Sequence, residues 1–158
     1  HPSIIASYLW NTFDFAVPMW GRGGVPARNL KGLVTFDRKI KKDSYFWYKA
    51  NWSKDPVLYL TQRRNTEREK KVTSVTIYSN IGTPKVYLNG QELNGIRKGY
   101  TDVHYVFDEV TLNNGKNTLT AIVRYKGKEY KDEIKWNYTG EKKREADSYV
   151  NKSVHAGW

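Results

Sequence analysis

Residue types that carry reactive chemistry are scarce in this chain of 158 residues. It contains no cysteine, which excludes disulfide bonds, a thiol nucleophile and thiolate metal sites. The three histidines, His1, His104 and His155, are too widely spaced to predict a metal site. These residues imply no metal and no organic cofactor.

Long apolar runs are also missing. None approaches the roughly 18 residues that a membrane span requires, so we expect no insertion into a membrane. The first residues have neither the pattern of a signal peptide nor an initiating methionine, which favours an excerpt of a longer protein. The chain is too short for a closed (β/α)8 barrel, which typically needs about 250 residues.

Basic residues, in contrast, are abundant. Lys and Arg number 27 against 16 Asp and Glu, which gives a net charge of +11. Such an excess makes polyanions, including nucleic acids, candidate ligands. Acidic residues are interleaved with the basic ones, however, and no single-strand-binding motif is present. We therefore expect no nucleic-acid partner.

The N-terminal third has the pattern of a strand, a loop and a helix. Residues 4–17 form an almost uninterrupted apolar and aromatic run, which predicts a strand buried on both faces, as in a parallel barrel. Pro18 ends this run, and the glycines within 21–24 indicate a long loop. Loops that follow barrel strands are the places where active sites form.

A helix is expected over residues 43–52, where Tyr45, Tyr48 and Trp52 fall on one stripe. Asp37 is a candidate N-cap for this helix. The sequence Lys54-Asp55-Pro56 should prevent the helix from continuing.

From Val57 the hydrophobic period becomes two, which is typical of half-buried strands. The turn residues Asn89-Gly90, Asn114-Gly115 and Lys126-Gly127 divide this region into hairpins. The pattern predicts an immunoglobulin-like antiparallel β-sandwich. Its strands are expected near 57–63, 71–80, 84–89, 103–112, 116–125 and 128–137.

An ordered series of motifs resembles the closing segment of glycoside hydrolase family 2, the β-galactosidases, β-glucuronidases and their relatives. The motifs are Tyr8 to Phe15 (YLWNTFDF), Lys31 to Lys39 (KGLVTFDRK), Asp43 to Trp52, Val75 to Asn80 and Val86 to Gly90. The resemblance implies a mainly β chain in which the last strand and helix of a TIM (β/α)8 barrel precede the sandwich. The implied domains are 1–54 for the barrel remnant, 55–138 for the sandwich and 139–158 for a tail.

Three residues are assigned to the substrate site by this resemblance. Trp10 would form a wall of the sugar subsite, where an indole offers a flat apolar surface to the C–H face of a sugar ring. Asn29 and Lys31 resemble the Asn-x-Lys motif with which β-glucuronidases hold the sugar carboxylate, a charge-assisted contact. Arg22 and Arg28 would raise the positive potential nearby. Related galactosidase-like sequences also carry a similar motif, so both sugars stay open, with a lean to glucuronides.

Catalytic carboxylates are expected elsewhere. A retaining glycosidase needs two, about 5 to 5.5 Å apart. Residues 1–54 contain no glutamate and only Asp14, Asp37 and Asp43. We expect Asp14 to order the strand end or the loop. The family's catalytic glutamates would precede His1, so this chain alone is predicted to be inactive and to have no catalytic residue of its own.

The alternative to an enzyme segment is a non-catalytic carbohydrate-binding sandwich, suggested by 6 Trp and 12 Tyr on a β scaffold. The partners implied by the main interpretation are a β-galactoside or β-glucuronide and the rest of the catalytic barrel, with a homo-oligomer left open. The resemblance implies the bacterial periplasm or cytoplasm without deciding between them. Without its barrel, the N-terminal segment should expose a large apolar patch and self-associate. Its expected members are Ile4, Ile5, Leu9, Phe13, Phe15, Trp20, Phe46 and Trp47.

Overall fold

The computed structural model describes residues 3, 6, 8–18 and 26–140. It divides into two compact units between Tyr45 and Phe46, and each unit is described by itself. The expected glycine loop with Trp20 and Arg22, the tail from residue 141, and the apolar residues Ile4 and Ile5 lie outside the described residues.

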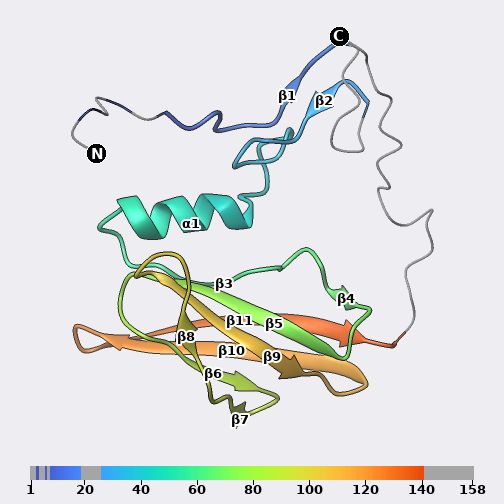
Figure 1. Cartoon of the computed structure of the whole chain (residues 1–158), viewed down its shortest axis with the longest axis vertical. Coiled ribbons are helices and arrows are strands. Elements are labelled where there is room, and N and C mark those ends of the chain that lie inside the picture. Colours follow the sequence, from blue (N-terminus) through green and yellow to red (C-terminus); the bar gives the residue numbers. More distant parts are fainter. Residues whose placement is uncertain (1–2, 4–5, 7, 19–25, 141–158) are drawn as a thin grey trace. The chain divides into compact units, whose positions relative to one another are not determined.

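The larger unit is a β-sandwich of two mainly antiparallel sheets (Figure 1). One sheet has the order β4-β11-β10-β6-β7, and the other has the order β3-β5-β9-β8. The mainly β, antiparallel part of the predicted fold is therefore confirmed. The strands are β3 (Leu58–Leu60), β4 (Glu67–Arg68), β5 (Val72–Ser79), β6 (Lys85–Leu88), β7 (Gln91–Glu92), β8 (Arg97–Lys98), β9 (His104–Thr111), β10 (Gly115–Tyr125) and β11 (Lys128–Tyr138).

The core lies between the two sheets, and alternate residues of β5 and β10 point into it. On β5 the buried set is Val75, Ile77 and Ser79, and on β10 it includes Leu119 and Ala121, as the period-two pattern predicts. Trp136 of β11 is the largest fully buried side chain. At about 25 cal/mol per Å² of apolar surface removed from water, this shared interior is the main stabilising term of the unit.

The hairpin between β10 and β11 is the longest antiparallel pairing, running from Gly115 opposite Tyr138 to Tyr125 opposite Lys128. Its two-residue turn places Lys126 at φ 50° and Gly127 at φ 75°. Two successive positive φ values match the right-handed twist of the paired strands, and glycine accepts them without a steric penalty.

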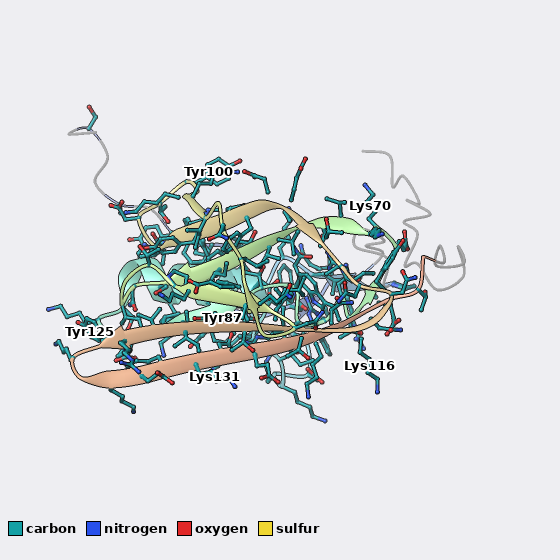
Figure 2. All side chains as sticks on the ribbon, turned by 90° about the horizontal axis from the view of Figure 1, so that it is seen from below. Lys70, Tyr87, Tyr100, Lys116, Tyr125 and Lys131 are labelled. Atoms are coloured by element: carbon teal, nitrogen blue, oxygen red, sulfur yellow. The ribbon has the colours of Figure 1, made fainter. Side chains whose placement is uncertain are left out.

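The outer edge of β11 is largely open. This strand pairs with β4 only at Asn137 and Tyr138, so no strand pairs with the rest of that edge in the described residues. The edge is densely charged: Glu133 lies 3.4 Å from the Lys131 ammonium and 3.8 Å from that of Lys135. Figure 2 shows Lys131 projecting from the hairpin away from the core.

The helix α1 spans Asp43–Trp52, as predicted. Within the larger unit its Phe46 ring stacks on Tyr59 of β3, with ring centroids 3.8 Å apart, and Ala50 is buried beside it. Tyr48 and Trp52 of the expected stripe contact each other, with ring centroids 4.7 Å apart, but Trp52 is 70% exposed. The face that packs on the sandwich is therefore that of Phe46 and Ala50, and Phe46 does not belong to the predicted exposed patch.

The predicted long buried strand over 4–17 is wrong for the residues described. Only β1 (Phe15–Ala16) is a strand there, while Trp10 is 73% and Phe13 41% exposed. A strand buried on both faces needs paired neighbours on each side and layers above and below. In the described residues this segment pairs only with β2 (Arg28–Asn29) and, through a bridge, with Val34. Its assignment to a (β/α)8 barrel stays a prediction.

Among the residues that the structure describes, no helix has the length and apolar character to cross a membrane. The same residues contain no group of three or more potential metal ligands.

Candidate functional site

The predicted site residues lie in the smaller unit, on a frame of two short strands. β1 and β2 pair antiparallel, with Phe15 opposite Asn29 and Ala16 opposite Arg28. The chain then turns back, and Val34 forms a parallel bridge with Phe13. The loop from Asn29 to Leu33 is therefore attached at both ends to the segment that carries Trp10.

Backbone hydrogen bonds hold the segment from Asn11 to Asp14 beside Leu33 and Val34. The amide of Leu33 donates to the carbonyl of Asn11 at 3.2 Å, and the amide of Val34 donates to that of Thr12 at 2.9 Å. In return the amide of Asp14 donates to the carbonyl of Val34 at 2.9 Å. Because Asn11 follows Trp10 and Leu33 comes two residues after Lys31, the predicted site residues belong to adjacent parts of one frame.

Gly32 allows the loop to lie flat against this frame. A Cβ atom at this position would be only 2.1 Å from both the amide nitrogen of Asp14 and the carbonyl carbon of Phe13. No side chain fits such an approach to backbone atoms, so this position requires glycine. Lys31 is thereby held next to the strand segment, and its own side chain is exposed.

Asn29 and Lys31 are linked directly. The Oδ1 atom of Asn29 accepts a hydrogen bond of 2.9 Å from the Lys31 backbone amide, a local turn typical of asparagine. Asn29 is only 6% exposed, yet its Nδ2 group donates no hydrogen bond within the described residues. Asn29 thus shapes the loop through its side-chain oxygen, and its role toward a ligand stays a prediction.

Trp10 stands at the beginning of the same segment. Its ring meets Phe15 edge-on, with centroids 6.1 Å apart, and most of its surface is free. The peptide bond between Trp10 and Asn11 is cis. An exposed indole that is supported by a second aromatic ring is a suitable surface for the apolar face of a sugar.

A buried ion pair lies beneath the loop. The Lys42 ammonium is 2.6 Å from Oδ1 of Asp14, and the two side chains are 13% and 3% exposed. The same ammonium donates to the carbonyl of Leu30 at 2.9 Å, and Oδ1 of Asp14 also accepts from the Gly32 amide at 2.9 Å. One lysine and one carboxylate therefore connect the strand segment, the loop and the residues that precede α1.

Two arginines flank this network without a carboxylate partner in the described residues. The Arg38 guanidinium stacks 4.2 Å from the ring centre of Phe13 and donates to the carbonyl of Asp14 at 3.0 Å. The Arg28 guanidinium stacks 4.4 Å from the ring centre of Phe36. Arg28 therefore stays close to the loop as predicted, and uncompensated cations favour an anionic ligand.

Asp37 does not cap the helix, so that prediction is wrong. The Thr35 hydroxyl donates to its Oδ1 atom at 2.6 Å and the Lys39 amide donates at 3.2 Å. These bonds, the Thr35 bond first, hold the pKa of the exposed Asp37 carboxyl below its ordinary value. Asp37 therefore stabilises the turn around Arg38 (φ 65°), several residues before the helix begins at Asp43.

The sequence suggested the three contact residues and an ordering role for Asp14, but it did not indicate Lys42. Lys42 closes a run of basic residues that has the pattern of a solvated surface. Its partner is 28 positions away, so no local signal could have identified it.

Comparisons with known proteins show that the chain matches one segment of longer proteins. No protein-family model matches the sequence. A β-glucuronidase of Bacteroides fragilis is 33% identical over 138 residues, which are 87% of this chain and 20% of that protein. The chain is homologous to one segment of that longer protein. The chain spans only 20% and 17% of the length of two curated relatives that it matches.

Solved structures agree in fold. A Bacteroides fragilis protein proposed to be a β-galactosidase is 80% identical, with a TM-score of 0.87, over 94% of this chain and 22% of that one. An FMN-binding β-glucuronidase of Faecalibacterium prausnitzii is 40% identical, with a TM-score of 0.69, over 84% and 19%. The resemblance to β-galactosidases and β-glucuronidases that the motifs predict is confirmed.

Proposed function

We propose that this chain is a C-terminal portion of a retaining β-glycosidase of glycoside hydrolase family 2, with a barrel remnant followed by an immunoglobulin-like sandwich. In this proposal Trp10, Asn29 and Lys31 contact the terminal sugar. The two catalytic glutamates come from other parts of the longer protein, and the sandwich supports the barrel.

The arrangement of Asn29 and Lys31 is the observation that carries the proposal. Asn29 uses its oxygen to hold the Lys31 backbone, so its Nδ2 group is the part of the amide that could donate to a ligand, while Lys31 presents an exposed ammonium from the same loop. An amide donor and an ammonium that begin this close together can converge on the two oxygens of one carboxylate. A sugar acid has that group and a neutral hexose does not.

The sugar specificity that we propose is therefore for β-glucuronides over β-galactosides. The guanidinium groups of Arg28 and Arg38, which have no carboxylate partner in the described part of the chain, favour an anionic substrate in the same way. The names of the relatives include both enzymes, so they support the glycosidase class more strongly than the choice of sugar.

Hydrolysis by the full-length protein that contains this chain tests the proposal. It should hydrolyse nitrophenyl β-glucuronide more efficiently than nitrophenyl β-galactoside. Lys31→Ala should reduce kcat/KM for the glucuronide by about 10- to 100-fold, the loss expected for one hydrogen bond to a charged group. Lys39→Ala, a neighbouring exposed lysine, should leave it unchanged. Unchanged glucuronide turnover in Lys31→Ala would refute the carboxylate clamp.

A further inference from the structure

Leu30, the middle residue of the Asn29-Leu30-Lys31 loop, is held by the side chain of Lys42, which is not part of the motif. The carbonyl of Leu30 accepts a hydrogen bond of 2.9 Å from the Lys42 ammonium, which in turn is 2.6 Å from Asp14 Oδ1. We propose that Asp14 and Lys42 are positioning residues that hold Asn29 and Lys31 in the geometry needed to bind a sugar carboxylate. This inference rests on the function proposed above.

The contacts that hold the loop meet at one carboxylate oxygen. A single oxygen, Oδ1 of Asp14, accepts from both the Lys42 ammonium and the Gly32 amide. Leu30 and Gly32 alternate with Asn29 and Lys31 along the loop, so every second residue is tied down. Of the predicted ligand contacts, Lys31 lies between these two ties and Asn29 lies directly before the first.

Burial makes this pair sensitive to mutation. The side chains of Lys42 and Asp14 are 13% and 3% exposed, so water cannot easily replace either partner. Removing one charge leaves the other buried and unpaired, which is costly, whereas removing both is much better tolerated. Loss of the Lys42 ammonium also leaves the Leu30 carbonyl without this donor and releases the centre of the loop.

Loss of the Lys42 contact should affect the hydrolysis of a glucuronide and of a galactoside differently. Two donors must converge on one carboxylate, and small displacements of such groups reduce rates strongly. A neutral galactoside makes no carboxylate contact, so its turnover should depend little on where Lys31 points. A loss limited to the acidic sugar therefore distinguishes positioning of this loop from general damage to the enzyme.

The test uses the full-length protein with Lys42→Met, which keeps the length of the side chain and removes the ammonium. The expected result is a decrease of roughly 10- to 100-fold in kcat/KM for nitrophenyl β-glucuronide, mainly through KM, with little change for the β-galactoside. Lys39→Met, exposed in the same segment, is the matched control and should behave like wild type. The double variant Asp14→Asn/Lys42→Gln removes both charges and replaces Lys42→Met if that variant does not fold.

A double-mutant cycle with Lys31→Ala decides whether Lys42 acts through the loop. If it does, Lys42→Met should cost little further glucuronide activity once Lys31 is absent, a non-additivity expected of coupled residues. Equal losses for both sugars, or additive losses in the cycle, would overturn the inference.

Hydrogen exchange provides a readout that does not depend on the proposed function. The amides of Gly32 and Leu33 should exchange faster in Lys42→Met than in Lys39→Met, because their loop has lost its tether. Unchanged exchange would overturn the positioning role even if glucuronide is the substrate. Faster exchange in a protein that does not hydrolyse glucuronide would instead support the tether and refute the proposed function.

Discussion

His104 illustrates how one buried side chain can make the sandwich sensitive to pH. Its Nδ1 atom accepts a hydrogen bond of 3.1 Å from the backbone amide of Tyr100, so the neutral ring is the one that fits. Burial, and then the nearby Arg97 guanidinium, lower the pKa of His104 below its ordinary value of 6.5. Protonation would also remove the acceptor that holds Tyr100.

The direction of the resulting pH dependence follows from this lowered pKa. In the unfolded chain His104 takes up a proton near pH 6.5, while the folded chain resists until a lower pH. The stabilisation is therefore complete above that pH and is lost progressively as the pH falls below it. Urea unfolding between pH 8 and pH 5 should show a steeper loss for wild type than for His104→Gln. Parallel curves for the two proteins would contradict this prediction.

Single residues also show what a sequence can reveal. Asn29 and Lys31 form a short local motif, and both were suggested by the resemblance of that motif to the one in β-glucuronidases. Lys42 and Arg68 were not, because their roles depend on distant partners: Arg68 stacks 4.2 Å from the ring centre of Trp136, far along the chain. A basic residue in a polar stretch has the pattern of a solvated one until the fold brings its partner to it.

At the scale of elements, Asn117 organises the connection between β9 and β10. This fully buried residue accepts from the Asn113 amide at 2.8 Å and donates to the carbonyls of Asn113 and Gly115 at 2.7 and 2.9 Å. It also accepts from the side chain of Asn89 at 3.2 Å, which comes from the turn after β6. One amide thus links the connection between the two sheets to the turn after β6.

Asn117→Ala should lower the free energy of unfolding by about 2 to 3 kcal/mol, because it removes several hydrogen bonds of a fully buried side chain and leaves a cavity. Lys116→Ala, its exposed neighbour on β10, should change stability by less than about 0.5 kcal/mol. Equilibrium denaturation monitored by tryptophan fluorescence measures both. Equal effects of the two substitutions would show that the hydrogen bonds of Asn117 do not stabilise the turn.

Long strands were predictable and short ones were not. The prediction of 71–80 corresponds to β5 (Val72–Ser79), because alternation at Val75, Ile77 and Ser79 is visible in the sequence. Strands of two residues, such as β7 (Gln91–Glu92), have no period to detect. The expected strand over 4–17 was wrong for a different reason. An apolar run indicates that residues could be buried, but a buried strand also needs neighbouring strands and packed layers.

At the scale of the whole molecule, the smaller unit presents large apolar side chains. Tyr8 is 91% exposed, Trp10 73%, Phe13 41% and Phe36 37%. Soluble monomers rarely expose large contiguous apolar patches. We expect this chain to self-associate when it is separated from the rest of the longer protein.

Light scattering over a range of concentrations tests this expectation. The apparent mass should rise with concentration, and the double variant Trp10→Ser/Phe13→Ser should reduce the rise. Tyr100→Ser is the matched control, since Tyr100 is 95% exposed but lies on the sandwich. A monodisperse monomer at every concentration would contradict the prediction.

The charged edge of β11 has a consequence for the fate of the sandwich. An unpaired strand edge is a template onto which strands of other chains can add, and this is how many β proteins begin to form fibrils. Here an incoming strand would have to dehydrate Lys131, Glu133 and Lys135, which already engage one another. Association of these chains should therefore stop at amorphous contacts through the N-terminal aromatic residues, without growth into amyloid.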